Sequence, residues 1–285
     1  MKNNFLILHP YNGKFYHTAD STRFSYWLTN SGFKWCLAFL VLAMLYPVHA
    51  AAGNYTYTMA FQAFLKWLPL LVTKGFVLNI IISFSAMMIG TAMGVILGLA
   101  QVSEYKAVRI IAGSITQLFR NIPWLVLLFI IMLTFPFEIE TADKIYKIPD
   151  WTKAVFGFSL PVMANISEIV RGAIKSVPLG QWEAAESLAF SRQKTFWQII
   201  LPQCYKRMIP PWMNWYAILS MATPLVSLLG VEEIITLSRQ AMEAENNNPE
   251  LLIPFYSFAL FIFFIYCYPI ARYTIALEKR YAVKL

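Results

Sequence analysis

Charged residues are scarce in this sequence. They make up 13% of its 285 residues, whereas hydrophobic residues make up 58%; soluble domains carry about 25% charged residues. The apolar residues are grouped in long stretches without charge. This pattern excludes an ordinary soluble domain and predicts an all-α polytopic membrane protein.

Cysteine and histidine are also rare, with three of each. Cys36, Cys204 and Cys267 lie far apart and lack paired or metal-ligand spacing, and the histidines form no helical ligand pair. Metal and redox chemistry are therefore not expected. The sequence has no Gly-x-x-x-x-Gly-Lys-Ser/Thr phosphate loop, so the chain does not hydrolyse ATP by that route.

The net charge of +8 is compatible with nucleic-acid binding, but its placement argues against it. Lys and Arg cluster between the apolar stretches, as expected where cytoplasmic loops carry the excess of basic residues. We therefore predict a lipid bilayer, and not nucleic acid, as the partner of this surface.

Six apolar stretches are long enough to cross a hydrocarbon core of about 30 Å. They are residues 35–52, 75–100, 117–136, 154–174, 208–231 and 251–271. With both termini in the cytoplasm, 17 of the 23 Lys and Arg residues lie on inside segments. The inverted arrangement would put this excess on the wrong side, so six crossings with both termini cytoplasmic are predicted.

The segments outside the crossings follow from this topology. Residues 1–34 are predicted to be a cytoplasmic arm and 276–285 a basic cytoplasmic tail. The predicted external segments are 53–74, 137–153 and 232–250, and the first of them is expected to contain an interfacial helix at 61–71. Ala50-Ala51-Ala52 resembles a signal-peptidase site, but the basic region before it is longer than a signal peptide needs. We favour an uncleaved first crossing over a cleaved one.

Three glycines recur every four residues in the second crossing: Gly90, Gly94 and Gly98. At helical spacing they lie on one face, which lets another helix approach closely. Packing within the chain and packing between subunits are equally compatible with this pattern.

The fourth crossing contains three polar residues, Asn165, Glu168 and Arg171. Glu168 and Arg171 are three apart and meet on one helix face, and ionisable groups within a span usually pair or face a polar pathway. A structural ion pair is favoured over direct contact with substrate. Arg120, before Pro123, is predicted near the cytoplasmic boundary, where its side chain can snorkel.

The fifth crossing contains Pro224, with Thr223 and Ser227 beside it. A proline in a span frees a backbone carbonyl that a cavity, a water or a hydroxyl must satisfy. The segment is a candidate for a gate or a pathway lining, and a simple packing kink is the alternative.

The longest polar interruption of the C-terminal half lies at residues 180–202, inside a basic segment 175–207. Pro178 and Gly180 favour a turn before it, and Glu183, Ala184 and Ala185 favour a helix. Pro202 is expected to end a second short helix. Two short helices joined at a bend outside the bilayer indicate a docking surface.

This segment resembles the cytoplasmic coupling loop of the permease subunits of bacterial ABC importers. The matching positions are Gly180, Gln181, Glu183, Ala184, Ala185, Ala189, Ile199, Leu201 and Pro202. The family usually has glycine at the position of Ala189. From about residue 68 to 275 the chain resembles the polar-amino-acid uptake permeases, through 119–123, 167–174 and 176–185; residues 221–225 depart from the usual Lys-x-Thr-Ser-Leu.

The resemblance implies a type I ABC importer permease fold with an extra N-terminal transmembrane helix, in the bacterial cytoplasmic membrane. It implies two cytoplasmic ATP-binding subunits, a second permease that is a sister chain or a copy, and an extracytoplasmic solute-binding protein. ATP and Mg would bind the ATPase, with no cofactor in this chain. A stand-alone channel or secondary transporter is the alternative, and an intramembrane enzyme a more distant one, since Glu168 and Arg171 lack a catalytic partner.

Overall fold

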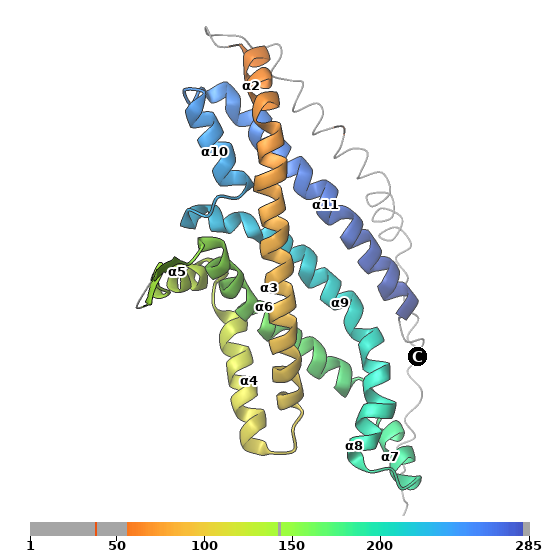
Figure 1. The fold of residues 1–285 in the computed structure, drawn as a ribbon. Coiled ribbons are helices and arrows are strands. Elements are labelled where there is room, and N and C mark those ends of the chain that lie inside the picture. The colour runs from red at the N-terminus through yellow and green to blue at the C-terminus, as the bar shows by residue number, and fades with distance from the viewer. Residues whose placement is uncertain (1–37, 39–55, 142–143, 282–285) are drawn as a thin grey trace, which may run out of the picture. The chain divides into compact units, whose positions relative to one another are not determined.

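A computed structural model describes residue 38 and residues 56–141 and 144–281. The predicted arm, all of the predicted first crossing except Ala38, and the last four residues of the tail lie outside the described residues. The chain divides into two units, 1–46 and 47–285. The elements of the second unit are helices and one short strand hairpin (Figure 1).

One helix of 45 residues runs from Tyr57 to Gln101. It consists of α2 (Tyr57–Leu70), the π turn η2 (Leu71–Phe76) and α3 (Val77–Gln101). At 1.5 Å per residue it is about 68 Å long. The prediction of a separate interfacial helix at 61–71 is therefore wrong. Pro69 lies inside α2, and the helix continues through the π turn that begins two residues later.

The glycines of α3 pack against α6 (Asp150–Lys175). A Cβ added at Gly90 would lie 2.5 Å from Val162, at Gly94 2.7 Å from Ile166, and at Gly98 2.7 Å from Val170. Side chains at these positions would therefore force the two helices apart. The three glycines therefore form an intramolecular packing surface. Of the two alternatives, packing within the chain and packing between subunits, the structure shows the first.

The predicted crossing at 117–136 is not one helix. α4 begins already at Lys106 and ends at Asn121, α5 runs from Trp124 to Thr134, and the two are bent by 101°. Pro123 lacks an N–H and holds Ile122 in the extended region, so both residues leave the helical conformation.

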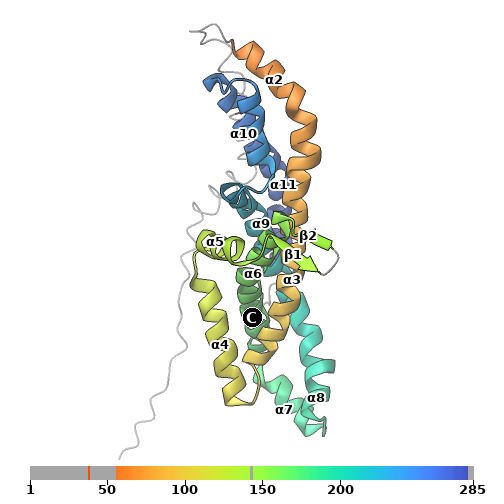
Figure 2. The ribbon, with the colours of Figure 1, turned by 60° about the vertical axis from the view of Figure 1, so that its left-hand side comes forward.

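The predicted outer loop at 137–153 is more ordered than expected. Strands β1 (Glu138–Thr141) and β2 (Lys144–Lys147) pair antiparallel (Figure 2), and α6 begins already at Asp150. Lys153 is therefore not a loop residue. Its side chain is 1% exposed, with Nζ 3.1 Å from Asp150 and 3.5 Å from the centre of the Phe137 ring.

After α6 the chain forms the short helix α7 (Leu179–Ser187) and then one long helix from Arg192 to Leu229. The long helix is divided into α8 (Arg192–Lys194), the π turn η3 (Thr195–Ile200), α9 (Leu201–Ala222) and the 3-10 turn η4 (Thr223–Leu229). The prediction that Pro202 ends a second short helix is wrong. Pro202 follows a wide turn at the first positions of α9, where an N–H is dispensable.

The predicted external segment 232–250 contains a helix, α10 (Ile234–Ala244), followed by η5 (Pro249–Leu251) and α11 (Leu252–Tyr281). α10 folds back onto η2: a Cβ at Gly75 would lie 2.8 Å from the Cα of Ile234. Burial of an apolar face of α10 explains why this acidic stretch is not a simple loop.

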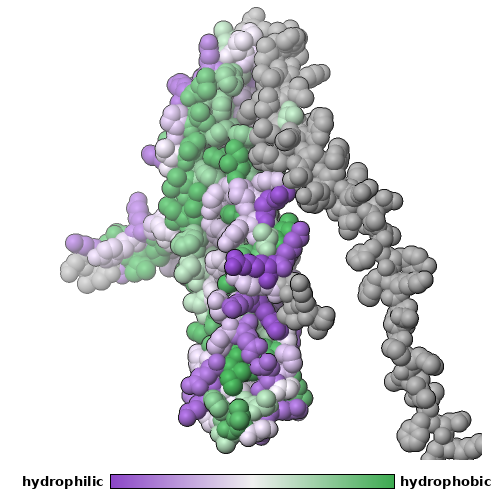
Figure 3. All heavy atoms as spheres, turned by 90° about the vertical axis from the view of Figure 1, so that its right-hand side faces the viewer, coloured by the Kyte–Doolittle hydropathy of each residue, from purple (hydrophilic) through white to green (hydrophobic). Residues whose placement is uncertain are grey.

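Two apolar cores hold the second unit together. One joins α3, α5, α6 and α9, and the other joins α2, η2, α10 and the start of α11. On the face shown in Figure 3, hydrophobic side chains gather toward the end that holds α2 and α10, and hydrophilic ones are more frequent toward the end that holds α7 and α8. Among the described residues, three helices are long and apolar enough to cross a membrane, and two bent pairs bring the number to as many as five.

Candidate coupling surface and translocation site

The predicted coupling residues Glu183, Ala184 and Ala185 lie on α7, at one end of the second unit (Figure 1). Ala185 is buried and Trp182 is half-buried against the core, whereas Glu183 and Ala184 are exposed. Two leucines at the ends of the helix point outward, with Leu179 71% and Leu188 72% exposed. The helix thus buries one face and presents a partly apolar face to a partner.

A tight turn closes α7 at Ala189, which has φ +59°. The N–H of Phe190 donates to the carbonyl of Ala185, and the N–H of Ala189 donates to that of Glu186. This is the hydrogen-bond pattern of a Schellman cap, whose left-handed residue is usually glycine. Ala189 adopts this conformation at a conformational cost.

We expect Ala189→Gly to stabilise this turn. The left-handed conformation costs an alanine roughly 1 kcal/mol relative to glycine, and the residue is exposed, so no packing is lost. Proteolysis of the 188–191 turn in native membranes should slow by several-fold in the variant. Ala184→Gly, which places glycine inside the same helix, should do the opposite; equal effects of the two changes would contradict the account.

The remaining predicted coupling residues lie at the start of the long helix. Ile199 is in η3, and Leu201 and Pro202 begin α9. Side chains from α9 tie this region to its neighbours. Gln203 donates to the Gln181 side chain at 3.0 Å, and Arg207 donates at 2.6 Å to both the carbonyl and the hydroxyl of Ser176. α7 is therefore tied to α9, and α9 is tied to the end of α6.

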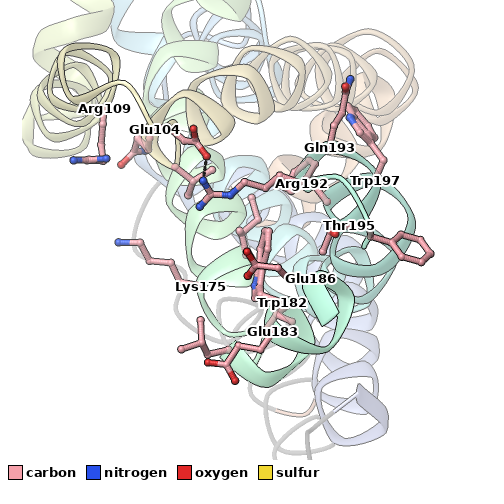
Figure 4. A pocket seen from close by; sticks show the side chains of 17 residues that line it. Glu104, Arg109, Lys175, Trp182, Glu183, Glu186, Arg192, Gln193, Thr195 and Trp197 are labelled. Atoms are coloured by element: carbon pink, nitrogen blue, oxygen red, sulfur yellow. Dashed lines mark hydrogen bonds and ion pairs between the residues drawn. The ribbon is translucent and has the colours of Figure 1, made fainter. Parts of the chain in front are cut away.

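A cavity of about 1310 Å³ separates α7 and α8 from the turn between α3 and α4 (Figure 4). Charges of both signs line it, among them Glu104, Arg109, Lys175, Glu183, Glu186 and Arg192. Arg192 spans the opening to pair with Glu104, as the dashed line in Figure 4 shows. Trp197, 56% exposed, also lines it; it was not predicted, because a lone exposed aromatic carries no pattern in the sequence.

Within the fourth crossing, Glu168 and Arg171 pair as predicted. Arg171 Nε lies 3.1 Å from Glu168 Oε1 and its Nη2 2.5 Å from Oε2, a bidentate arrangement. Arg120, from α4, approaches Oε2 of the same carboxylate at 3.6 Å. Arg120 lies in the last turn of α4. Asn165, the third polar residue of this predicted crossing, donates to the carbonyl of Pro161 in its own helix.

A buried hydrogen-bond network lies beside this cluster. Gln101 of α3 donates to Thr116 of α4 and Ser167 of α6, each at 3.0 Å, and the two hydroxyls are 2.9 Å apart. Satisfied buried networks fix helix positions because breaking one leaves polar groups unpaired. The network was not predicted, since its members are up to 66 residues apart in sequence.

The fifth-crossing candidates lie in η4. Pro224 cannot donate to the carbonyl of Ser220. This carbonyl accepts the backbone N–H of Thr223 and also, at 2.8 Å, the hydroxyl of the same residue. A hydroxyl, one of the three groups expected to reach this carbonyl, therefore contacts it beside the backbone N–H. Ser227 contributes its backbone carbonyl, which accepts from Arg239 at 2.9 Å.

Thr223 belongs to a junction that sequence reasoning missed. Asn79 donates to Thr223 at 2.9 Å and to Glu233 at 3.1 Å, and accepts from the N–H of Ile234 at 3.2 Å. Glu233 is fully buried and caps α10 by accepting from the N–H groups of Ile235 and Thr236. The junction joins α3, η4 and α10.

Replacing Asn79 by alanine should weaken this junction. It leaves Glu233 Oε2 and the Ile234 N–H without the amide, and each buried group left unpaired costs about 1–3 kcal/mol. We expect a clear loss of thermal stability in detergent. Asn165→Ala, which removes only a bond within one helix, is the matched control and should cost less; an equal loss would contradict the assignment.

Long apolar helices with buried polar networks between them define an integral membrane protein. Residues 90–281 match the family described as "Binding-protein-dependent transport system inner membrane component". The chain belongs to this family. It is the permease subunit of an ATP-driven importer and a transport component, not an enzyme.

Known relatives agree with this assignment. The chain is 33% identical to the L-cystine transport system permease protein TcyB of Bacillus subtilis, over 74% of this chain and 86% of the relative. It is 35% identical to the probable amino-acid ABC transporter permease protein YckA of the same organism, over 74% and 89%. A solved amino acid ABC transporter with histidines aligns with TM-score 0.65 and 25% identity, over 77% and 98%. The resemblance to importer permeases and the type I fold are thereby confirmed.

Proposed function

We propose that this chain forms the translocation pathway for polar amino acids or related small polar solutes. The observation that carries the proposal is the charged cluster of Glu168, Arg171 and Arg120, which is held between α4 and α6 within the predicted crossings. Charged groups inside spans are costly and mark substrate pathways. The two Bacillus relatives are described as cystine and amino-acid permeases, which supports the same solute class.

The proposed coupling element is residues 180–202. Its support is geometric: α7 exposes Glu183 and two leucines while Trp182 and Ala185 anchor it to the core. Closure of an ATPase pair on ATP would move α7. The hydrogen bond from α9 to α7, and that from α9 to the end of α6, would carry the movement into the spans. The continuity of the helix through Pro202 supports this transmission of movement, because α8 to η4 form one helix.

The assembly we propose has two permease subunits, identical or sister chains, with two cytoplasmic ATP-binding subunits that hold ATP and Mg. A solute-binding protein would deliver the solute from outside. We also propose six crossings in the bacterial cytoplasmic membrane with both termini inside, the first being residues 35–52, and a permease domain at 68–275. Asn165, Thr223, Pro224 and Ser227 are proposed to support the pathway through backbone contacts.

Uptake by the reconstituted complex tests the function. Proteoliposomes with this chain, its ATPase, any sister permease and its binding protein should accumulate at least one of the twenty standard amino acids or L-cystine. Accumulation should require ATP and the binding protein. Uptake driven by an ion gradient through this chain alone would contradict the proposal.

A further inference from the structure

The Glu168 cluster contains more positive than negative charge. One carboxylate faces two guanidinium groups, and the bidentate contact with Arg171 occupies both of its oxygens. Arg120 is only at ion-pair distance, 3.6 Å, from Oε2. Glu168 and Arg171 therefore neutralise each other, and the charge of Arg120 remains in excess.

The excess charge of Arg120 lies at a partly exposed position. Its side chain is 37% exposed, compared with 18% for Glu168. It sits in the last turn of α4, directly before the 101° break at Ile122 and Pro123. An ionised group within a span needs a counter-charge or water, and a guanidinium presents a planar fork of donors that matches a carboxylate.

The supports around Arg120 are rigid. The carboxylate of Glu168 is held by Arg171, and the backbone of α4 is held by the Thr116 bonds to Gln101 and Ser167. A donor group that is held in place before binding loses less conformational freedom when its ligand arrives. The Glu168–Arg171 pair orients Arg120 without using up its hydrogen-bonding capacity.

We propose that Arg120 binds the carboxylate of the transported solute. This inference rests on the proposed function and deepens it: the permease itself distinguishes an amino acid from the corresponding amide. Glu168 and Arg171 are positioning residues, because they act through Arg120. An arginine–carboxylate contact of ordinary strength corresponds to roughly ten- to a hundredfold in affinity.

The test uses the complex in nanodiscs without the solute-binding protein, so that the discriminating site lies in the membrane subunits. The radiolabelled probe is the amino acid or L-cystine that the wild-type complex binds most tightly. Unlabelled competitors are the same compound and its carboxamide. The wild-type complex should prefer the carboxylate by roughly tenfold or more.

Arg120→Gln should remove this preference, and Arg120→Lys should retain part of it. Lys106→Gln, which removes a positive charge from the first turn of the same helix, should leave the preference intact. If Arg120 bound a lipid headgroup or had a purely structural role, Arg120→Gln would weaken the binding of the carboxylate and of the carboxamide equally. The ratio of their affinities would then stay unchanged.

An unchanged ratio in Arg120→Gln overturns this inference and leaves the proposed function standing. A wild-type complex that transports none of the amino acids or L-cystine overturns the proposed function, and this inference with it.

Discussion

Replacing Glu183 by lysine should abolish uptake while leaving the protein inserted in the membrane. The side chain is exposed on α7, where the surface for the ATPase is proposed, and the change replaces a negative charge with a positive one at its centre. Like-charge juxtaposition or an unpaired charge in an interface costs several kcal/mol, enough to reduce docking by more than a hundredfold. We therefore expect no uptake above background, with normal amounts of chain in the membrane fraction.

The control for this change is Glu250→Lys, which makes the same replacement in η5, far along the chain from α7. Uptake by that variant should remain close to wild type. Normal uptake by Glu183→Lys, measured with radiolabelled solute at equal expression, would count against the coupling surface.

Gly94→Ala should destabilise the protein, although it adds only one methyl group to α3. The new Cβ would lie 2.7 Å from Ile166 Cβ and 2.7 Å from the carbonyl oxygen of Met163. Overpacking of this kind costs about 1–3 kcal/mol, which exceeds the gain of about 1 kcal/mol in helix propensity. Thermal unfolding in detergent, followed by tryptophan fluorescence, should shift to lower temperature.

Gly113 offers a matched control in α4, because a Cβ there would meet nothing within 4 Å. Gly113→Ala should be neutral or stabilising, since only the helix-propensity gain remains. If both substitutions shift the unfolding temperature equally, the stripe does not pack as the structure places it.

Local patterns predicted a large part of this fold. The length of the apolar stretches predicted α3, α6 and α11, and the four-residue glycine spacing predicted a close helix approach. The three-residue spacing of Glu168 and Arg171 predicted their pair. In each case the signal is local: it is either the composition of one stretch or the spacing of residues a few positions apart. Such signals can be recognised without knowing the tertiary structure.

The predictions failed where tertiary packing overrides a local rule. Pro202 was expected to end a short helix, and residues 61–71, which contain Pro69, were expected to form a separate one. In both places the helix continues through a neighbouring π turn. Pro123, expected near the start of a span, breaks one instead. Proline disfavours a helix, and the neighbouring packing decides whether it breaks or only distorts it.

The buried polar junction was out of reach of the sequence for a different reason. Asn79 meets Thr223 and Glu233 across 144 and 154 residues. Glu233 stands in an acidic stretch that composition assigns to the outside, yet it caps a helix that folds back onto the core. A single sequence contains no signal that joins residues so far apart.

The most direct test of the account is where α7 docks. A photo-crosslinking amino acid at Leu188, which is 72% exposed, should capture the ATPase subunit in intact membranes. The same group at Leu133, 75% exposed at the end of α5, should not. Capture of the ATPase from Leu133 but not from Leu188 would contradict the assignment of residues 180–202 as the coupling element.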